Sequence, residues 1–177
     1  MDLDTILGTS PDSSEHAPYF GKYVALAAGG NILATLERHL GDMQSLLTSI
    51  GEERGGHRYA PDKWNIREVV GHVNDTERVF AYRALRIARG DQAPLEGFDQ
   101  DRYVLAGPFG RVSLADLGRE FTAVRQATLA LFRPLDAAAW MRRGLANQNE
   151  VSVRALAFMI AGHQRHHCNI LVERYLS

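Results

Sequence analysis

The stretch ALAFMIAGHQRHHCNILVERY, residues 155–175, places three of the chain's seven histidines in one helical pattern. Residues four apart lie on the same face of a helix, so His163 and His167 point the same way, about one turn apart. Apolar residues precede and follow the pair on this face, which indicates that both imidazoles face the interior. Helices chelate metals with this spacing, so the pair is a candidate for metal ligands. The alternative is two core histidines bonded to carbonyls or carboxylates.

The residues next to His163 and His167 in the sequence exclude some of the reactions that a metal here could support. His166 is a second choice as ligand, because residues three apart also share a helix face. A zinc protease needs Glu directly after the first histidine as general base, and here that residue is Gln164, which disfavours peptidase chemistry of that type. The single cysteine, Cys168, follows His167 directly. Adjacent helical residues do not face each other, so we expect a packed side chain rather than a nucleophile.

The composition is typical of one globular domain. The 177 residues are 45% hydrophobic and 23% charged, which suits a sizeable core. A net charge of -1 argues against nucleic acid or an anionic membrane as partner. The chain begins with acidic residues, unlike a signal peptide, and no apolar run approaches the ~20 residues of a membrane span. One cysteine fits a reducing compartment, so we expect a cytoplasmic protein.

Four long segments carry apolar residues at helical spacing. Each begins at a residue that favours the N-cap position: Asn31, Asn65, Ser113 and Ser152. The first helix is expected to run to about residue 50 and the second to the loop that begins at Gly90. The third ends before Pro134, and the fourth runs almost to the C-terminus. No segment has a convincing strand pattern, so the predicted fold is all-α, a four-helix bundle.

The segments outside these helices are predicted from their Gly, Pro and Ser content. Residues 1–16 are expected to form a flexible N-terminal arm, and residues 17–177 the bundle domain. Residues 90–110 form a long loop, which we interpret as the wall or lid of a site, because long loops in compact domains usually serve function. A short amphipathic piece is expected at residues 137–141, followed by a polar loop.

The second predicted helix supplies a third histidine, His72, at the edge of its buried stripe. A pair from one helix and one histidine from another leave coordination positions open, which is typical of a reactive metal rather than a structural one. Asp75 could orient a ligand imidazole or accept a substrate proton. The alternative for a carboxylate here is solvation and pairing with arginine, which we favour for Glu77. Three arginines follow a line that could bind a carboxylate or phosphate, although a hydrated face is the commoner explanation: Arg83, Arg86 and Arg89.

The run KWNIREVVGHVNDTER, residues 63–78, resembles the second-helix signature of the DinB-like superfamily. The resemblance covers roughly residues 17–176 and continues through ARGD, GFDQDRY, VSVRAL and AGHQRHH, at residues 88–91, 97–103, 151–156 and 161–167. It implies a four-helix bundle, often a homodimer, with a divalent metal on three histidines, one from the second helix and two from the last. These correspond to His72, His163 and His167, the residues that the spacing also favours.

The superfamily includes enzymes that use low-molecular-weight thiols such as bacillithiol and mycothiol. The resemblance therefore implies zinc or nickel that activates such a thiol for attack on a small electrophile, in stress response or detoxification. A cationic centre stabilises a thiolate, so this chemistry is physically consistent. In this thiol S-transferase, Asp75 or Tyr103 would handle protons and Arg83 would hold an anionic cofactor.

Two other functions stay open at this point. One is a metal-dependent hydrolase, in which the metal lowers the pKa of water and Asp75 acts as base. The other is a non-enzymatic bundle that binds a metal or a small ligand, with the histidines as ordinary core residues. The sequence contains no dense basic patch interleaved with aromatic residues, which again argues against nucleic-acid binding.

Overall fold

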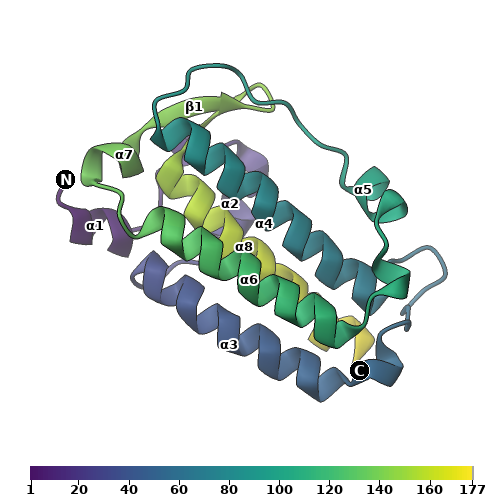
Figure 1. Ribbon diagram of the computed structural model, residues 1–177. Helices are drawn as coiled ribbons and strands as arrows, with labels where there is room; N and C mark the ends of the chain where they lie inside the picture. The colour runs from purple at the N-terminus through teal and green to yellow at the C-terminus, as the bar shows by residue number, and fades with distance from the viewer. Residues whose placement is uncertain (177) are drawn as a thin grey trace.

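The computed structural model describes residues 1–176, and most of these residues are helical (Figure 1). The helices are α1 Leu3–Gly8, α2 Gly21–Leu26, α3 Ile32–Ile50, α4 Ile66–Ala88, α5 Gln100–Ala106, α6 Leu114–Phe132, α7 Ala137–Met141 and α8 Val153–Ile170, and the strands are β1 Arg143–Ala146 and β2 Asn149–Ser152. Short 3-10 turns lie at Ser13–Glu15, Pro18–Phe20, Glu52–Arg54 and Phe109–Arg111, and a π-helical turn lies at Leu171–Tyr175. Within residues 1–176, no helix is both long and apolar enough to cross a bilayer.

The four long helices α3, α4, α6 and α8 form a closed bundle, as predicted (Figure 1). Helices α3 and α4 each pack against both α6 and α8, so each long helix buries its apolar stripe against two neighbours. The four predicted N-caps are correct. Each cap side chain accepts a hydrogen bond from a backbone amide in the first turn of its helix. Asn65 and Glu68 also form the reciprocal capping box that fixes the start of α4.

A β-hairpin connects α7 to α8, where the sequence pattern predicts only a polar loop. Strand β1 pairs with β2 in antiparallel register, from Arg143 opposite Ser152 to Ala146 opposite Asn149. The two turn residues between the strands, Asn147 and Gln148, have φ angles of 48° and 62°. A two-residue hairpin turn of type I′ requires a positive φ angle at both of its residues. The strands escape prediction because each has only four residues, too few for a clear alternation.

The long segment 90–110, predicted as a loop, contains the helix α5. Asp99 caps this helix by accepting hydrogen bonds from the amides of Asp101 and Arg102 at 3.0 and 3.1 Å. The part before α5 is held to the hairpin, because the Leu95 amide donates to the carbonyl of Leu145 at 2.9 Å. The segment therefore starts beside the hairpin, where α4 ends, and runs along the bundle to α5 near the opposite end (Figure 1).

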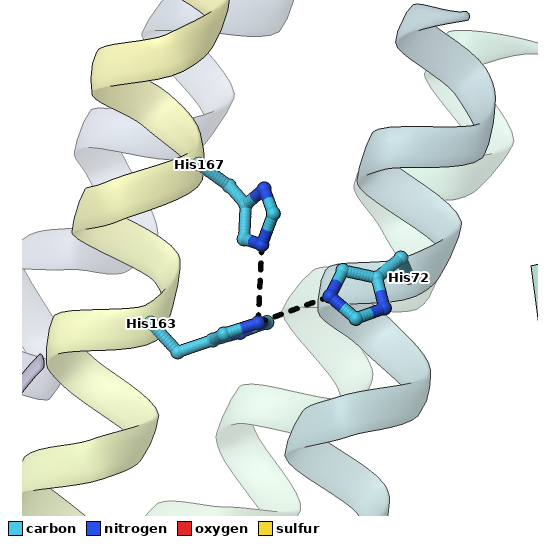
Figure 2. A group of neighbouring side chains, drawn as sticks. All are labelled: His72, His163 and His167. Atoms are coloured by element: carbon cyan, nitrogen blue, oxygen red, sulfur yellow. Dashed lines mark hydrogen bonds between the residues drawn. The ribbon is translucent and has the colours of Figure 1, made fainter. Parts of the chain in front are cut away.

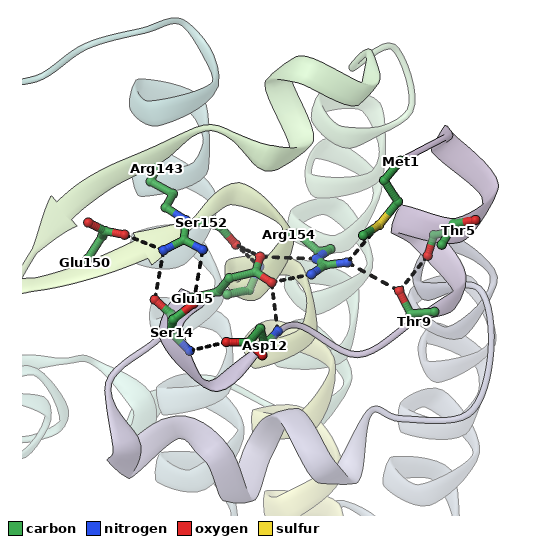
Figure 3. A network of polar contacts seen from close by, with 11 residues as sticks. Met1, Thr5, Thr9, Asp12, Ser14, Glu15, Arg143, Glu150, Ser152 and Arg154 are labelled. Atoms are coloured by element: carbon green, nitrogen blue, oxygen red, sulfur yellow. Dashed lines mark hydrogen bonds and ion pairs between the residues drawn. The ribbon is translucent and has the colours of Figure 1, made fainter.

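Residues 1–16 lie against the bundle, which differs from the expected flexible arm (Figure 3). Ile6 and Leu7 of α1 are buried, and Glu15 is only 1% exposed. Its carboxylate accepts a hydrogen bond from Ser152 Oγ at 2.8 Å and is ion-paired with Arg154. Burial raises the pKa of Glu15, but these contacts outweigh it and hold the pKa below its usual value. Ser152 and Arg154 lie at the start of α8, 137 and 139 residues from Glu15, so the residues near Glu15 in the sequence give no sign of these contacts.

The core consists of two apolar clusters separated by a polar level, to which each long helix contributes. On α4, for example, buried apolar residues end at Val73 and resume at Phe80, and on α6 they end at Phe121 and resume at Leu129. The buried polar side chains at this level come from α3, α4, α6 and α8: His39, His72, Thr76, Glu77, Arg125, Thr128, His163 and Gln164. Buried polar groups need partners, so this level decides how the four helices align.

Arg125 of α6 occupies the centre of this level and contacts the other three long helices. Its guanidinium donates two hydrogen bonds to the carboxylate of Glu77, both of 2.8 Å. It also donates to Gln164 Oε1 at 2.8 Å and to the carbonyl of Leu36 at 2.9 Å. Gln164 in turn donates to the carbonyl of His39 at 2.7 Å. Glu77, predicted to be solvated, is therefore a buried ion-pair partner, because an arginine 48 positions away reaches it.

We expect Arg125→Met to destabilise the fold strongly, because it leaves the buried carboxylate of Glu77 without its partner. Loss of one member of a buried ion pair typically costs about 3–5 kcal/mol. Arg119→Met, on an exposed part of the same helix, should change the free energy of unfolding by less than about 0.5 kcal/mol. Urea unfolding followed by circular dichroism measures both. The double variant Arg125→Met with Glu77→Leu should recover most of the loss, and equal losses in all three proteins would contradict this assignment.

Candidate metal centre

Three imidazoles from two neighbouring helices converge at the polar level of the bundle (Figure 2). His72 comes from α4, and His163 and His167 come from successive turns of α8. The Nε2 atom of His163 lies 3.0 Å from Nε2 of His72 and 3.1 Å from Nε2 of His167. Tetrahedral zinc with Zn–N bonds of 2.0–2.1 Å holds its nitrogens roughly 3.3 Å apart. The three predicted ligands therefore lie together at a spacing that fits one metal ion.

The three imidazoles are electrically neutral at neutral pH. Burial lowers the pKa of His72 to about 4. Burial, followed by the proximity of the other histidines, holds the pKa of His163 and of His167 well below the ordinary value. Nδ1 of His72 lies 3.4 Å from Oγ1 of Thr76, so a proton on Nδ1 can be donated there, which leaves the Nε2 lone pair free for a metal.

The contacts of these rings differ from those of ordinary core histidines. Nε2 of His163 has two other imidazole nitrogens as its hydrogen-bond neighbours, rather than a carbonyl or a carboxylate. One proton cannot serve three lone pairs, whereas one cation can. Nδ1 of His167 is buried and has no hydrogen-bond partner among residues 1–176. The donor set therefore suits a divalent metal better than it suits a self-contained core cluster.

The residues next to the predicted ligands face other surroundings. His166, the second choice, packs its ring edge-on against Tyr23 at 5.3 Å between centroids. Gln164, where a zinc protease would have Glu, points to a different side of α8 from His163 and accepts a hydrogen bond from Arg125. Cys168 is buried, and burial raises the pKa of its thiol to about 11. This cysteine is therefore protonated at neutral pH, in agreement with the packed role predicted for it.

A cavity of about 190 Å³ lies beside the triad, and His72 and His163 form part of its wall. Its walls come from α2, α4, α8, the turn of the hairpin and residues 97–100, so the segment 90–110 does contribute a wall, as predicted. Five of the side chains that line it are phenylalanine or tyrosine: Tyr19, Phe20, Tyr23, Phe80 and Phe98. The polar side chains on the wall, besides the histidines, are Thr76, Arg83, Gln100, Asn147, Asn149 and Glu150. Such a mixture suits a small organic ligand with a few polar groups.

Close packing of α2 on α8 closes one side of this cavity. A Cβ atom at Gly162 would lie 1.8 Å from the carbonyl oxygen of Tyr23, so only glycine permits this approach. The approach brings the Tyr23 ring to 5.4 Å from the ring of His163, centroid to centroid. Gly162, directly before His163, is therefore glycine because α2 packs against α8 at this point.

The structure brings one of the three predicted substrate or cofactor residues to the cavity. Arg83 lines it. Asp75 is half-buried, which raises its pKa, and its carboxylate is ion-paired with Arg78 at 3.3 Å, outside the cavity lining. Tyr103 is 45% exposed, packs against Phe98 with centroids 5.2 Å apart, and is not among the residues that line the cavity. These positions do not support the proton-transfer roles predicted for Asp75 and Tyr103.

Two further residues touch the triad without having been predicted as part of the site. Thr76 contacts His72 from the next turn of α4, and its i, i+4 spacing from that histidine is a signal that the sequence does contain. The ring of Trp64 lies 4.8 Å from the ring of His72, centroid to centroid. Its position just before the N-cap of α4 carries no such signal, because Trp64 lies outside the helix and the i, i+4 spacing rule does not apply to it.

Acidification is expected to destabilise the metal-free protein. The pKa of His72 falls from 6.5 to about 4 on folding, so between these values the unfolded chain binds a proton that the folded chain does not. The stability contributed by the neutral imidazole is complete above pH 6.5 and is lost as the pH falls toward 4. Its full loss amounts to roughly 3 kcal/mol.

Urea unfolding of chelator-treated protein across this pH window measures the effect. His72→Gln should show a clearly weaker pH dependence than the wild type, since it removes one of the groups that titrate. If the two proteins lose stability in parallel, His72 is not a buried neutral imidazole.

Comparisons with known proteins agree with the fold. The structure of YfiT from Bacillus subtilis, described as a probable metal-dependent hydrolase with an unusual four-helix bundle topology, is similar with a TM-score of 0.76, 13% identity and 97% of each chain covered. The mycothiol-dependent maleylpyruvate isomerase matches with a TM-score of 0.66 and 12% identity, over 78% of this chain and 58% of the isomerase. No curated protein sequence matches. The family model of the DinB superfamily matches residues 35–171, which include all three histidines, and the chain therefore belongs to the DinB superfamily.

Proposed function

We propose that this protein is a divalent-metal-dependent enzyme whose metal is held by His72, His163 and His167. The observation that carries the proposal is the convergence of three neutral Nε2 atoms, two of them on imidazoles that line a cavity. Three protein ligands leave at least one position for a small molecule, as in catalytic rather than structural sites. When bound, the metal supplies positive charge that favours the deprotonated form of a thiol or of water. Imidazole ligands suit zinc and nickel, the two metals we propose.

Within this class, we propose a thiol S-transferase that acts on small electrophiles. The aromatic side chains beside His163 would pack against the electrophile and exclude water from it. A metal held by these histidines would lower the pKa of the thiol so that its proton could pass to water, and no protein base would be needed, which agrees with the position of Asp75 away from the cavity. The mycothiol dependence of one structural neighbour is consistent with a thiol cosubstrate. A cytoplasmic location and a homodimer stay predictions.

The alternative is a metal-dependent hydrolase, the activity ascribed to the neighbour YfiT. Hydrolysis would call for a base near the attacking water. The carboxylate on the cavity wall is that of Glu150, whose ion pair with Arg143 is 2.5 Å long and partly exposed. Glu150, rather than Asp75, would then be the base. A third possibility is a bundle that binds metal or a small ligand without catalysis.

We expect about one zinc or nickel ion per chain in untagged protein purified without chelator, measured by inductively coupled plasma mass spectrometry. The variant His163→Ala with His167→Ala should lose the metal, whereas His166→Ala should keep it. Trp64 provides a second readout, because its ring lies 4.8 Å from that of His72. In a Trp140→Phe background, nickel should quench the fluorescence of Trp64 in the presence of the triad only. Protein that stays metal-free after incubation with both ions would contradict the proposal.

Activity separates the transferase from its alternatives. Metal-loaded protein should consume bacillithiol or mycothiol in the presence of a haloarene or an epoxide. This activity should fall at least a hundredfold, roughly the loss of one transition-state charge contact, after chelation or in His72→Ala. Ester hydrolysis without added thiol, lost in Glu150→Gln, would instead establish the hydrolase. If metal-loaded protein does neither, the non-enzymatic alternative holds.

A further inference from the structure

One buried arginine lacks the partner that the other buried charges have. Apart from histidines, the buried charged side chains of residues 1–176 are Glu15, Glu77, Arg83, Arg125 and Arg154. Glu15 is paired with Arg154, and Glu77 is paired with Arg125. Arg83 is 6% exposed and forms no ion pair with any carboxylate of the described residues. A guanidinium does not lose its charge in proteins, so burial without an anion is costly.

Arg83 is held in a defined position at the cavity wall. One of its amino groups, Nη2, donates to the carbonyl of Glu96 at 2.7 Å. The guanidinium carbon lies 5.7 Å from the ring centroid of Phe80 and 5.9 Å from that of Phe98. Contacts with aromatic rings orient the planar group but do not neutralise it. A guanidinium has five N–H donors, so most of them stay available for a ligand.

The cavity beside Arg83 carries an unmatched positive charge. Arg83 is the one lysine or arginine on its described wall, and the carboxylate there, that of Glu150, is already paired with Arg143. The volume of the cavity is about 190 Å³. It is below the ~300 Å³ at which drug-sized sites begin. The cavity therefore suits a small molecule with a single negative charge.

We propose that Arg83 anchors the carboxylate of a small substrate in this cavity. The carboxylate would accept hydrogen bonds from the free guanidinium N–H groups, and an unsaturated or aromatic body would pack against Phe80 and Phe98. The same cavity wall includes His72 and His163, so the far end of such a ligand meets the candidate metal centre. The proposal deepens the proposed function by naming the substrate class, and its reactive half rests on that function.

A carboxylate fits this anchor better than a phosphate. A phosphate monoester carries up to two charges near neutral pH, whereas in the metal-free protein Arg83 supplies the one cation on the described wall, with one amino group already bonded to Glu96. A carboxylate has a single charge and two oxygens, which match the fork of a guanidinium. The distance between the anchor and the triad then selects among carboxylates by the length of their carbon skeleton.

The test compares benzoate with its uncharged analogue benzamide on chelator-treated protein, by isothermal titration calorimetry. Benzoate should bind the wild type, and Arg83→Met should weaken this binding at least tenfold, since it removes a charge-assisted hydrogen bond. Benzamide should bind both proteins equally and weakly. Arg89→Met removes the same charge from an exposed position at the end of α4 and should bind benzoate like the wild type.

Two results would overturn the anchor: no benzoate binding to the wild type, or equal benzoate affinity in the wild type and Arg83→Met. Metal content of the same proteins keeps the two proposals separate. Arg83→Met should hold zinc or nickel in the same ratio as the wild type. If the wild type binds benzoate but no metal, the proposed metal-dependent enzyme is wrong and the carboxylate site is supported. If it binds metal but does not prefer benzoate to benzamide, the carboxylate site is wrong and the metal centre is supported.

Discussion

The buried contacts of Arg125 are the constraint on which the site depends. Its guanidinium joins Glu77 of α4 to Gln164 of α8, and both residues are sequence neighbours of groups that build the triad, Thr76 and His163. Adjacent helical residues point about 100° apart, so one side of α4 and α8 serves the ion pair while another side serves the imidazoles. A shift of either helix would break both sets of contacts. The buried pair thus holds the two ligand-bearing helices in one register.

Burial produces the chemistry on both sides of the cavity, with opposite consequences for the groups involved. It removes the charge from the three imidazoles, because a histidine can release its proton, and so exposes lone pairs to a metal. Arg83 cannot do the same, and its charge remains in the cavity wall without a protein anion among the described residues. A metal and an anionic ligand would each satisfy one of these groups. Phe80 packs near both His163 and Arg83, so the part of the cavity wall between these two residues is apolar.

Local patterns in the sequence predict a large part of this fold. All four N-caps, the four long helices and the meeting of His72 with the pair on α8 agree with expectations from spacing and resemblance. The expectations that differ from the structure concern the ion-pair partners of individual carboxylates, not the positions of the helices. Glu77 finds an arginine 48 positions away, and Glu15 finds one 139 positions away. Asp75, on the same helix as both His72 and Glu77, faces an arginine outside the cavity.

The sequence by itself determined the helices, their order and the shared face of His163 and His167, because helical periodicity, capping and the His-x-x-x-His spacing act within a few residues of each position. Only the tertiary structure decided which charges are paired, where the hairpin turn and α2 close the cavity, and that Arg83 remains without a carboxylate. The reason is physical: the environment of a buried charge is the sum of contacts from several distant segments, and it exists only after those segments have packed.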